Sequence, residues 1–251
     1  MFPSTQPMDP SGNPLAPAPG RGEPGATPVA GASENAGSGI TDLSSLSPSL
    51  LQDLLRFDQH GTQHELLEVL AACIRHTQAL AIRVGFDHQE LTLSVFPRHR
   101  LVHCPLAIDA FLSADLSQLQ VLQVQPATLR APGDPELARI GNPAAYTALG
   151  PVLWTVALLG SRSELLPELA GQAAYRVAPG LNLGGLPVSV AMGQCITRLR
   201  RQTCNLRDIA EWQTIGRVRA ARLLNALYLQ SGLIVSRTHP AATNEGWGGY
   251  R

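Results

Sequence analysis

Apolar residues first recur with a helical period just after Ser47. The leucines of residues 50–55 follow a Ser-Pro pair, which predicts a short helix with Ser47 as its N-cap and the proline in its first turn. A second helix is predicted from a capping box, because Thr62 and Glu65 stand in front of another apolar run. This second helix should end near Thr77.

The period changes to that of a strand over residues 80–86, where large apolar side chains alternate with Ala, Arg and Gly. Residues 91–95 resume the alternation after a polar turn, and residues 101–104 either form a third strand or continue the second beyond a proline. A short helix over 107–112 and a strand over 119–124 complete the series. The order of elements is compatible with small sensory or dimerisation modules, PAS-like and roadblock-like ones among them, by analogy alone.

Two segments show neither a helical nor a strand-like hydrophobic period, and they define the predicted domain boundaries. Residues 1–48 hold nine of the 20 prolines and seven of the 23 glycines, so this part of the chain has little apolar surface to bury. Such a composition does not offset the entropy of ordering, which predicts a disordered tail over residues 1–46. Residues 126–143 are punctuated by proline and predict a linker between an α/β module at 47–125 and a helical region at 144–251.

The helical region completes an α+β fold class: a tail, a small α/β module with an antiparallel sheet, and a helical C-terminal region. Residues 151–159 and 163–172 have helical patterns, and residues 175–188 indicate a loop.

Residues 189–251 have the sharpest pattern in the chain. A first helix ends in the basic cluster Arg-Leu-Arg-Arg, and Thr203 or Asn205 then caps the short helix Leu-Arg-Asp-Ile-Ala-Glu-Trp. A third helix, residues 217–230, has an apolar stripe about 100° wide and stops at Gly232, ahead of a strand. The stripe consists of Ala220, Leu223, Leu224 and Leu227.

This C-terminal unit resembles a winged helix. Leu-Arg-Asp-Ile-Ala would be the scaffold helix, residues 217–230 the helix in the recognition position, and the strand after it the first wing strand. Thr-His-Pro-Ala-Ala-Thr-Asn-Glu-Gly-Trp-Gly would form the wing loop, and the sequence departs from the pattern by ending where the returning wing strand begins. The resemblance concerns the fold and does not by itself specify an activity.

Winged-helix proteins commonly contact DNA through the third helix, so the resemblance directs attention to its outward face. Arginine and asparagine suit the edges of guanine and adenine. Val218 and Leu229 fall on the same predicted face, and exposed apolar residues are typical of a protein interface or of packing against the preceding module. In that case the arginines would form ion pairs with the acidic remainder of the chain. The candidate residues for binding nucleic acid or a partner are Arg217, Arg219, Arg222 and Asn225.

The charge distribution keeps both of these interpretations open. All 19 basic residues of the 251 are arginine and they balance 19 acidic residues, which excludes a uniformly basic nucleic-acid coat and any lysine-dependent chemistry. The net charge of zero results from opposite charge excesses in two parts of the chain. Residues 1–194 hold 10 arginines and 16 acidic residues, whereas residues 195–251 hold nine arginines and three acidic residues. A locally basic C-terminal unit can face a polyanion or the acidic part of its own chain.

Catalytic and metal chemistry find little support in the motifs. Cys73, His76, His103 and Cys104 are ligands of the right type for zinc, but adjacent strand residues point to opposite faces, so His103 and Cys104 would not easily converge on one ion. The segment His-Glu-Leu-Leu-Glu has Glu68 where a zinc protease needs a second histidine, and neither a serine-nucleophile elbow nor a dinucleotide glycine motif is present. We therefore predict no catalytic residue, no metal and no cofactor.

The sequence also has no secretory signal, and its longest apolar stretch, residues 151–160, is too short to cross a bilayer. Four cysteines without a CxxC pair indicate thiols rather than disulfides, and the exclusive use of arginine suggests a GC-rich bacterial genome. We expect a cytoplasmic, non-enzymatic bacterial regulatory or adaptor protein that acts through protein contacts or self-association. One alternative is a DNA-binding transcriptional regulator that uses the winged-helix-like unit, and another is a Cys/His metal-binding protein.

Overall fold

A computed structural model describes residues 46–58, 65–86, 89–212 and 215–242. The predicted tail up to residue 45, the capping residue Thr62 and the end of the predicted wing lie outside the described residues. The helices are α1 (Pro48–Asp58), α2 (Leu66–His76), α3 (Ile108–Leu112), α4 (Leu149–Leu159), α5 (Val190–Arg201), α6 (Leu206–Ala210) and α7 (Gly216–Leu229). The strands are β1 (Leu80–Phe86), β2 (Gln89–Phe96), β3 (Leu101–His103), β4 (Gln120–Pro126), β5 (Tyr146–Ala148), β6 (Ala174–Val177) and β7 (Leu233–Ser236).

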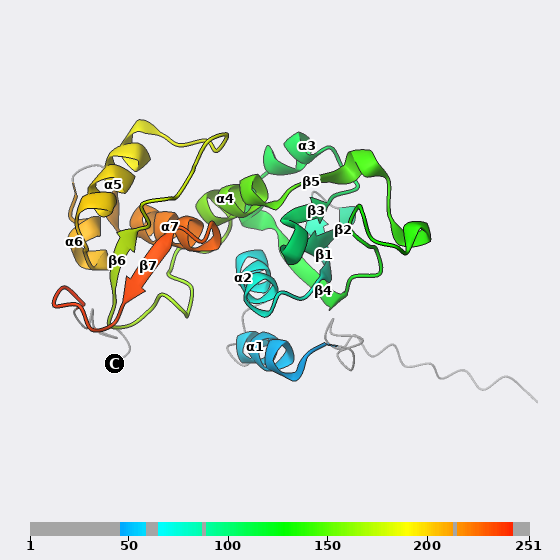
Figure 1. The fold of residues 1–251 in the computed structure, drawn as a ribbon, viewed down its shortest axis with the longest axis horizontal. Coiled ribbons are helices and arrows are strands. Elements are labelled where there is room, and N and C mark those ends of the chain that lie inside the picture. The colour runs from blue at the N-terminus through cyan, green and yellow to red at the C-terminus, as the bar shows by residue number, and fades with distance from the viewer. Residues whose placement is uncertain (1–45, 59–64, 87–88, 213–214, 243–251) are drawn as a thin grey trace, which may run out of the picture. The chain divides into compact units, whose positions relative to one another are not determined.

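These elements confirm the predicted α+β class (Figure 1). Ser47 precedes α1 as expected, and its hydroxyl accepts a hydrogen bond from the Leu50 amide at 3.4 Å. Helix α2 ends at Thr77, which adopts the left-handed conformation that commonly closes a helix. No described helix is long and apolar enough to cross a membrane.

Five strands form an antiparallel sheet in the order β4-β1-β2-β3-β5. The predicted hairpin is confirmed, because the large apolar residues of β1 lie opposite those of β2 and are buried. A 3-10 turn at Pro97–His99 separates β2 from β3, so residues 101–103 form a third strand instead of continuing the second. The apolar pairs are Leu80 with Val95, Ile82 with Leu93 and Val84 with Leu91.

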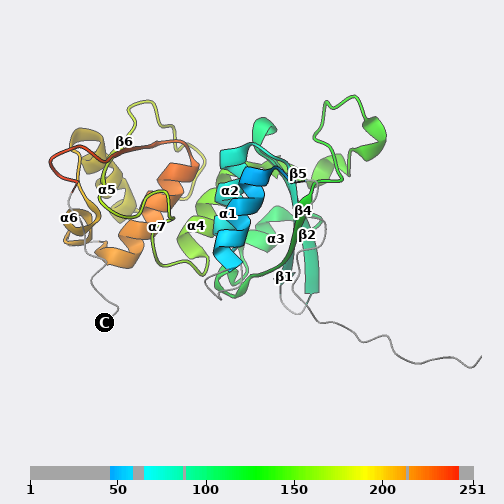
Figure 2. The ribbon, with the colours of Figure 1, turned by 90° about the horizontal axis from the view of Figure 1, so that it is seen from below.

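Helices α1, α2 and α4 lie on one side of this sheet (Figure 2). Helix α1 packs on α2, and α2 and α3 contact α4. The apolar side chains of these elements join those of α5, α6 and α7 in one buried cluster, in which Trp154 and Leu153 are 0% exposed. Burying one such large apolar side chain stabilises a fold by roughly 1.5–3 kcal/mol, so this shared cluster holds the described elements together.

The opposite face of the sheet is also covered. Ala81, Ser94, His103 and Tyr146 are successive partners across β1, β2, β3 and β5, and therefore form one row. Ala81 is 2% exposed and Ser94 is 3% exposed, although neither lies on the face that packs against the helices. Something besides the helices therefore excludes water from this row.

The segment predicted as a linker, residues 126–143, covers that row. The Tyr146 hydroxyl donates a hydrogen bond to the Arg130 carbonyl at 2.6 Å and accepts one from the Gly141 amide at 2.9 Å. Gly141 lies so close to His103 that a Cβ atom would be 2.8 Å from its Nε2. Beyond the segment the chain returns to the same sheet as β5, which pairs with β3. The predicted linker therefore does not end the sheet, and the described residues from 46 onward belong to one compact unit.

Two predictions for the helical region are corrected. Residues 163–172 form no helix, and Tyr175–Val177, expected in a loop, belong to β6. Pro167 supplies no amide for a helical hydrogen bond. Side chains from distant elements bond to the backbone on both sides of this proline instead, Asn225 to the Leu166 amide and Arg237 to the Glu168 carbonyl. Residues 160–173 are called the bridging segment below.

The C-terminal unit follows its predicted helices closely. Ser189 caps α5 by accepting from the Met192 amide, and Asn205, one of the two predicted caps, accepts from the Asp208 amide at 2.8 Å. The apolar stripe of α7 is 0% exposed at all four positions. After Gly232, β7 pairs with β6, and Tyr175 of β6 also bridges to Cys204 on its other edge.

Candidate functional site

The residues proposed for binding on α7 separate in the structure into buried and exposed ones. Asn225 was expected on the outward face but is 0% exposed. Its Oδ1 accepts a hydrogen bond from the Leu166 amide at 2.9 Å, and its Nδ2 donates to the Glu164 carbonyl at 2.9 Å. Leu229 is 2% exposed, which also corrects its predicted exposure. Asn225 is therefore committed to the bridging segment and cannot present its amide to a base edge.

The Arg222 side chain is likewise hydrogen-bonded to the backbone of its own chain. Its guanidinium donates to the carbonyls of Leu158 at 2.9 Å, Gly160 at 2.9 Å and Arg162 at 3.0 Å. These carbonyls belong to the last turn of α4 and the residues just after it, where a helix leaves carbonyl groups without intrahelical partners. A cation at this end of a helix also interacts favourably with the helix dipole. Arg222 thus acts as a C-cap of α4 supplied by a different helix.

Helix α7 packs along α4 in the antiparallel sense. Arg222 lies at the C-terminal end of α4, and at its other end Gln230 donates a hydrogen bond from Nε2 to the Gly150 carbonyl at 2.8 Å. The two helices make extensive contact, and α6 packs on α7 as well. The helix in the recognition position is therefore largely enclosed by elements of its own chain.

Gly160 is required where α4 ends under Arg222. A Cβ atom at this position would lie 2.5 Å from the Val156 carbonyl oxygen, which real Cβ atoms do not tolerate. Gly160→Ala is expected to lower the free energy of unfolding by roughly 1–2 kcal/mol, because the last turn of α4 must move. Urea unfolding measures this loss. Gly180→Ala is the matched control, since a Cβ there meets nothing within 4 Å, and an equal loss in both variants would contradict the steric argument.

The N-terminal turn of α7 remains at the surface. Arg217, Val218 and Arg219 are exposed, with Val218 45% exposed. Arg217 lies 3.8 Å from Glu164, and both of these side chains are more than half exposed, so this ion pair contributes little stability. Of the four predicted binding residues, Arg217 and Arg219 are thus the two that can meet another molecule.

A cavity of about 520 Å³ lies beside Arg219, between α4, α7 and residues 187–192. Its walls are mostly apolar, and the indole of Trp154 forms part of them while donating from Nε1 to the Pro187 carbonyl at 3.0 Å. We call this cavity the α4/α7 cavity. The complete lining is Trp154, Thr155, Leu158, Leu159, Pro187, Val188, Ser189, Met192, Arg219 and Arg222.

A second, shallower hollow follows the outward face of α5. Its lining includes Gln194, Thr197, Arg198 and Arg201, and the Arg198 guanidinium lies 4.2 Å from the centre of the Trp212 ring. Arg198 and Arg201 are exposed, as is Arg200 between them. The basic character of the C-terminal unit is therefore concentrated on α5 as much as on α7.

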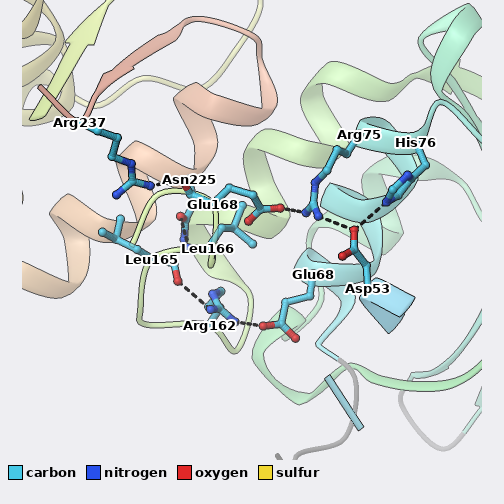
Figure 3. A network of polar contacts seen from close by, with 10 residues as sticks. All are labelled: Asp53, Glu68, Arg75, His76, Arg162, Leu165, Leu166, Glu168, Asn225 and Arg237. Atoms are coloured by element: carbon cyan, nitrogen blue, oxygen red, sulfur yellow. Dashed lines mark hydrogen bonds and ion pairs between the residues drawn. The ribbon is translucent and has the colours of Figure 1, made fainter. Parts of the chain in front are cut away.

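The bridging segment connects this C-terminal unit to α1 and α2 through a network of charged side chains (Figure 3). Arg162 forms ion pairs with Glu65 at 2.8 Å and with Glu68 of α2, and it donates to the Leu165 carbonyl at 2.7 Å. On α2, Arg75 forms ion pairs with Asp53 of α1 and with Glu168 of the bridging segment. Acidic side chains of residues 1–194 are thus paired here with arginines of that same part of the chain, whereas α7 contributes the exposed pair of Arg217 with Glu164.

The residues considered for a metal site are held apart in different contacts. His76 lies 2.7 Å from Asp53, and the Cys73 thiol donates to the Gln78 carbonyl at 3.1 Å. The His103 ring packs edge-on against Tyr146, with 4.9 Å between the ring centres, and burial lowers its pKa. Among the described residues no group of three or more His, Cys, Asp or Glu side chains is placed to hold a metal ion.

The buried thiols predict how stability changes at alkaline pH. Burial raises the pKa of Cys73 from 9.0 to about 12, and burial with the nearby Cys204 raises that of Cys195 to about 12. A thiol with a raised pKa holds its proton more tightly in the folded chain, so its contribution to stability is complete below pH 9 and is lost between pH 9 and 12.

Each buried thiol is therefore expected to cost up to about 1.4 kcal/mol of unfolding free energy per pH unit above 9. Urea unfolding at pH 8 and pH 10 measures this slope. The double variant Cys73→Ala, Cys195→Ala should show a smaller decline than the natural chain. Equal declines in the two proteins would show that these thiols do not titrate with raised pKa values.

Sequence reasoning found Arg217 and Arg219 but missed the α4/α7 cavity. The cavity forms only when α4, α7 and residues 187–192 meet, and these segments are far apart in the chain. Leu159, which lines the cavity and is 55% exposed, ends the apolar run of residues 151–159, and its sequence position does not distinguish it from the buried residues of that run. The charge cluster on α5 was visible in the sequence as Arg-Leu-Arg-Arg.

Comparison of the chain with protein-family models, with curated proteins and with solved structures finds no match to any of them.

Proposed function

We propose that this chain is a non-enzymatic bacterial regulatory or adaptor protein that acts through protein contacts made by its C-terminal unit. The unit has three helices followed by a strand, as in a winged helix. β6 lies along β7, between β7 and Cys204, in the place where a winged helix has its returning strand. This arrangement supports a winged-helix-like unit whose sheet is completed by a strand from the N-terminal side.

One observation carries the choice of protein contacts over DNA. The helix in the recognition position packs on α4, and two of its four predicted reading residues, Arg222 and Asn225, are bonded to the backbone of the same chain. A helix that reads bases must lie free in the major groove with several side chains reaching base edges. The surface left beside α7 is an apolar cavity with Arg219 at its margin, which is typical of a protein interface.

The mass of the protein purified gently from its source cells tests this proposal. Light scattering after size exclusion, with and without nuclease, is expected to show a complex larger than 26.7 kDa that nuclease leaves unchanged. The complex should contain protein only, either another chain or further copies of this one. A species of monomer mass, or a complex that nuclease reduces to monomer mass, would contradict it.

A DNA-binding regulator is the second candidate, and the charge asymmetry favours it. Residues 195–251 carry nine arginines and three acidic residues, and Arg198, Arg200 and Arg201 are exposed on α5. Phosphate contacts of this kind make affinity fall steeply with salt. A shift assay on genomic fragments at 50 and 200 mM salt, with Arg200→Ala/Arg201→Ala as the variant, tests this function. Tight binding that weakens with salt and with the variant would favour DNA over protein contacts.

A further inference from the structure

We propose that the α4/α7 cavity binds an acidic amphipathic helical segment of a partner protein, with apolar side chains inside the cavity and a carboxylate on Arg219. This inference rests on the proposed function, because it names the surface and the chemistry of the partner. It is independent of which partner the cell supplies.

The lining of the cavity identifies the apolar part of the partner. The half-buried Leu158, Val188 and Met192 present aliphatic and thioether groups to a space of about 520 Å³, and Trp154 also lines it but is itself fully buried. Cavities of roughly 300–1,000 Å³ with such linings are the size that proteins use to bury most of a small apolar group. At the edge, Leu159 leaves 55% of its surface in water and would lose that exposure under a bound segment. Removing this surface from water supplies the affinity.

The form of the partner follows from the elements that build the walls. Helix α4 contributes Trp154, Thr155, Leu158 and Leu159, which span roughly 8 Å along its axis at 1.5 Å per residue. Helix α7 contributes Arg219 and Arg222, one turn apart. A strand would need free backbone groups to pair with. The two helices offer none, and in the third wall the Pro187 and Ser189 carbonyls already accept from Trp154 Nε1 and the Gly193 amide. A helix laying apolar residues at i, i+3, i+4 and i+7 into a groove matches these walls.

Charge identifies the flank of the partner. The described part of the chain shows no acidic side chain in contact with Arg219, and this arginine is exposed. Arg222, the other cation of the lining, already donates to three carbonyls. One exposed guanidinium beside an apolar cavity complements one carboxylate beside an apolar stripe. A polyanion is a poor fit here, because phosphate-driven binding uses a row of cations and no apolar cavity.

Two synthetic 14-residue helical peptides test the inference on the full chain. Both carry leucines at i, i+3, i+4 and i+7, and they differ only in the two residues beside that stripe, which are Glu in one and Lys in the other. Fluorescence anisotropy is expected to show the Glu peptide binding about three- to tenfold more tightly than the Lys peptide. Dodecanoate, an apolar chain with one free carboxylate, is the competitor.

Three variants locate the binding. Arg219→Glu should invert the preference, so that the Lys peptide binds more tightly. Leu159→Asp should weaken both peptides more than tenfold. Leu137→Asp is the matched control, because Leu137 is 74% exposed on the segment that covers the far face of the sheet, and it should change nothing.

Absence of peptide binding, an unchanged preference in Arg219→Glu, or an equal effect of Leu137→Asp would overturn the inference. Dodecanoate binding more tightly than the Glu peptide would overturn it too, by assigning the cavity to a small amphiphile. These outcomes differ from failure of the proposed function. If the peptides fail while the purified chain still forms a nuclease-resistant protein complex, the protein contacts its partner through another surface.

Discussion

Replacing Asn225 with leucine is expected to lower the free energy of unfolding by about 3 kcal/mol. Leucine fills a similar space but cannot bond to the Leu166 amide or the Glu164 carbonyl, both of which Asn225 engages at 2.9 Å. A buried backbone group that loses its partner costs about 1–3 kcal/mol; the Leu166 bond is buried, and the partly buried bond to the Glu164 carbonyl adds a smaller loss. The substitution should therefore let the bridging segment separate locally from α7, and it should also destabilise the whole chain.

Urea unfolding of the two proteins measures the total loss, and hydrogen exchange at the Leu166 amide reports the local one. Asn182→Ala is the matched control, because Asn182 is exposed and accepts from the Gly184 amide in its own turn. The control should lose less than about 0.5 kcal/mol. If Asn225→Leu is as stable as this control, Asn225 is not the internal anchor that the hydrogen bonds indicate.

Replacing Arg162 with leucine is expected to cost a similar amount, about 3 kcal/mol. The Arg162 side chain is 14% exposed and that of its partner Glu68 is 13% exposed, so the substitution leaves a carboxylate largely buried without its cation. Removing one member of a buried pair typically costs 3–5 kcal/mol, and the partial exposure of Glu65 places this case at the lower end. The Leu165 carbonyl also loses its donor.

The double variant Arg162→Leu, Glu68→Gln separates the charge effect from the packing effect. Removing the buried carboxylate as well should recover at least about 1 kcal/mol of the loss, as measured by urea unfolding. Arg207→Leu is the surface control, because its partner Glu211 is 66% exposed, and it should change stability by less than about 0.5 kcal/mol. A double variant less stable than Arg162→Leu alone would contradict the buried-charge argument.

The sequence could predict the parts of the fold that local patterns determine. Ser47 and Asn205 lie at the starts of their helices as caps, and the apolar stripe of α7 is buried as its period required. The hairpin of β1 and β2 followed from strict alternation, because a shift of one residue would turn every leucine and valine to the wrong face.

The remaining features depend on contacts between distant segments. The helical period places Asn225 on the outward face of α7. It is buried because the bridging segment packs against that face. The same segment has a helical pattern, yet side chains of Asn225 and Arg237 bond to its backbone in a non-helical form. The proline-rich segment 126–143 resembled a linker because its anchor, the Tyr146 hydroxyl, lies beyond it in the chain.

The candidate site could be predicted only in part, for the same reason. The excess of arginine in residues 195–251 could be counted, but the destination of each arginine could not. Arg222 and Arg237 donate to backbone carbonyls of α4 and the bridging segment, which uses these guanidinium donors within the chain, although Arg237 is exposed. Arg219 keeps its side chain at the surface and beside the α4/α7 cavity, and this juxtaposition required the folded chain.

Site-specific photo-crosslinking in the source cells tests most directly whether the α4/α7 cavity is where this protein meets its partner. A photoreactive amino acid replaces Leu159 at the cavity, and in a control replaces Leu137, which is 74% exposed on the opposite side of the sheet. We predict a discrete, nuclease-resistant protein adduct from position 159 that is absent from position 137 and is lost when Arg219→Glu is added. No adduct, the same adduct from both positions, or an adduct to nucleic acid would contradict the account.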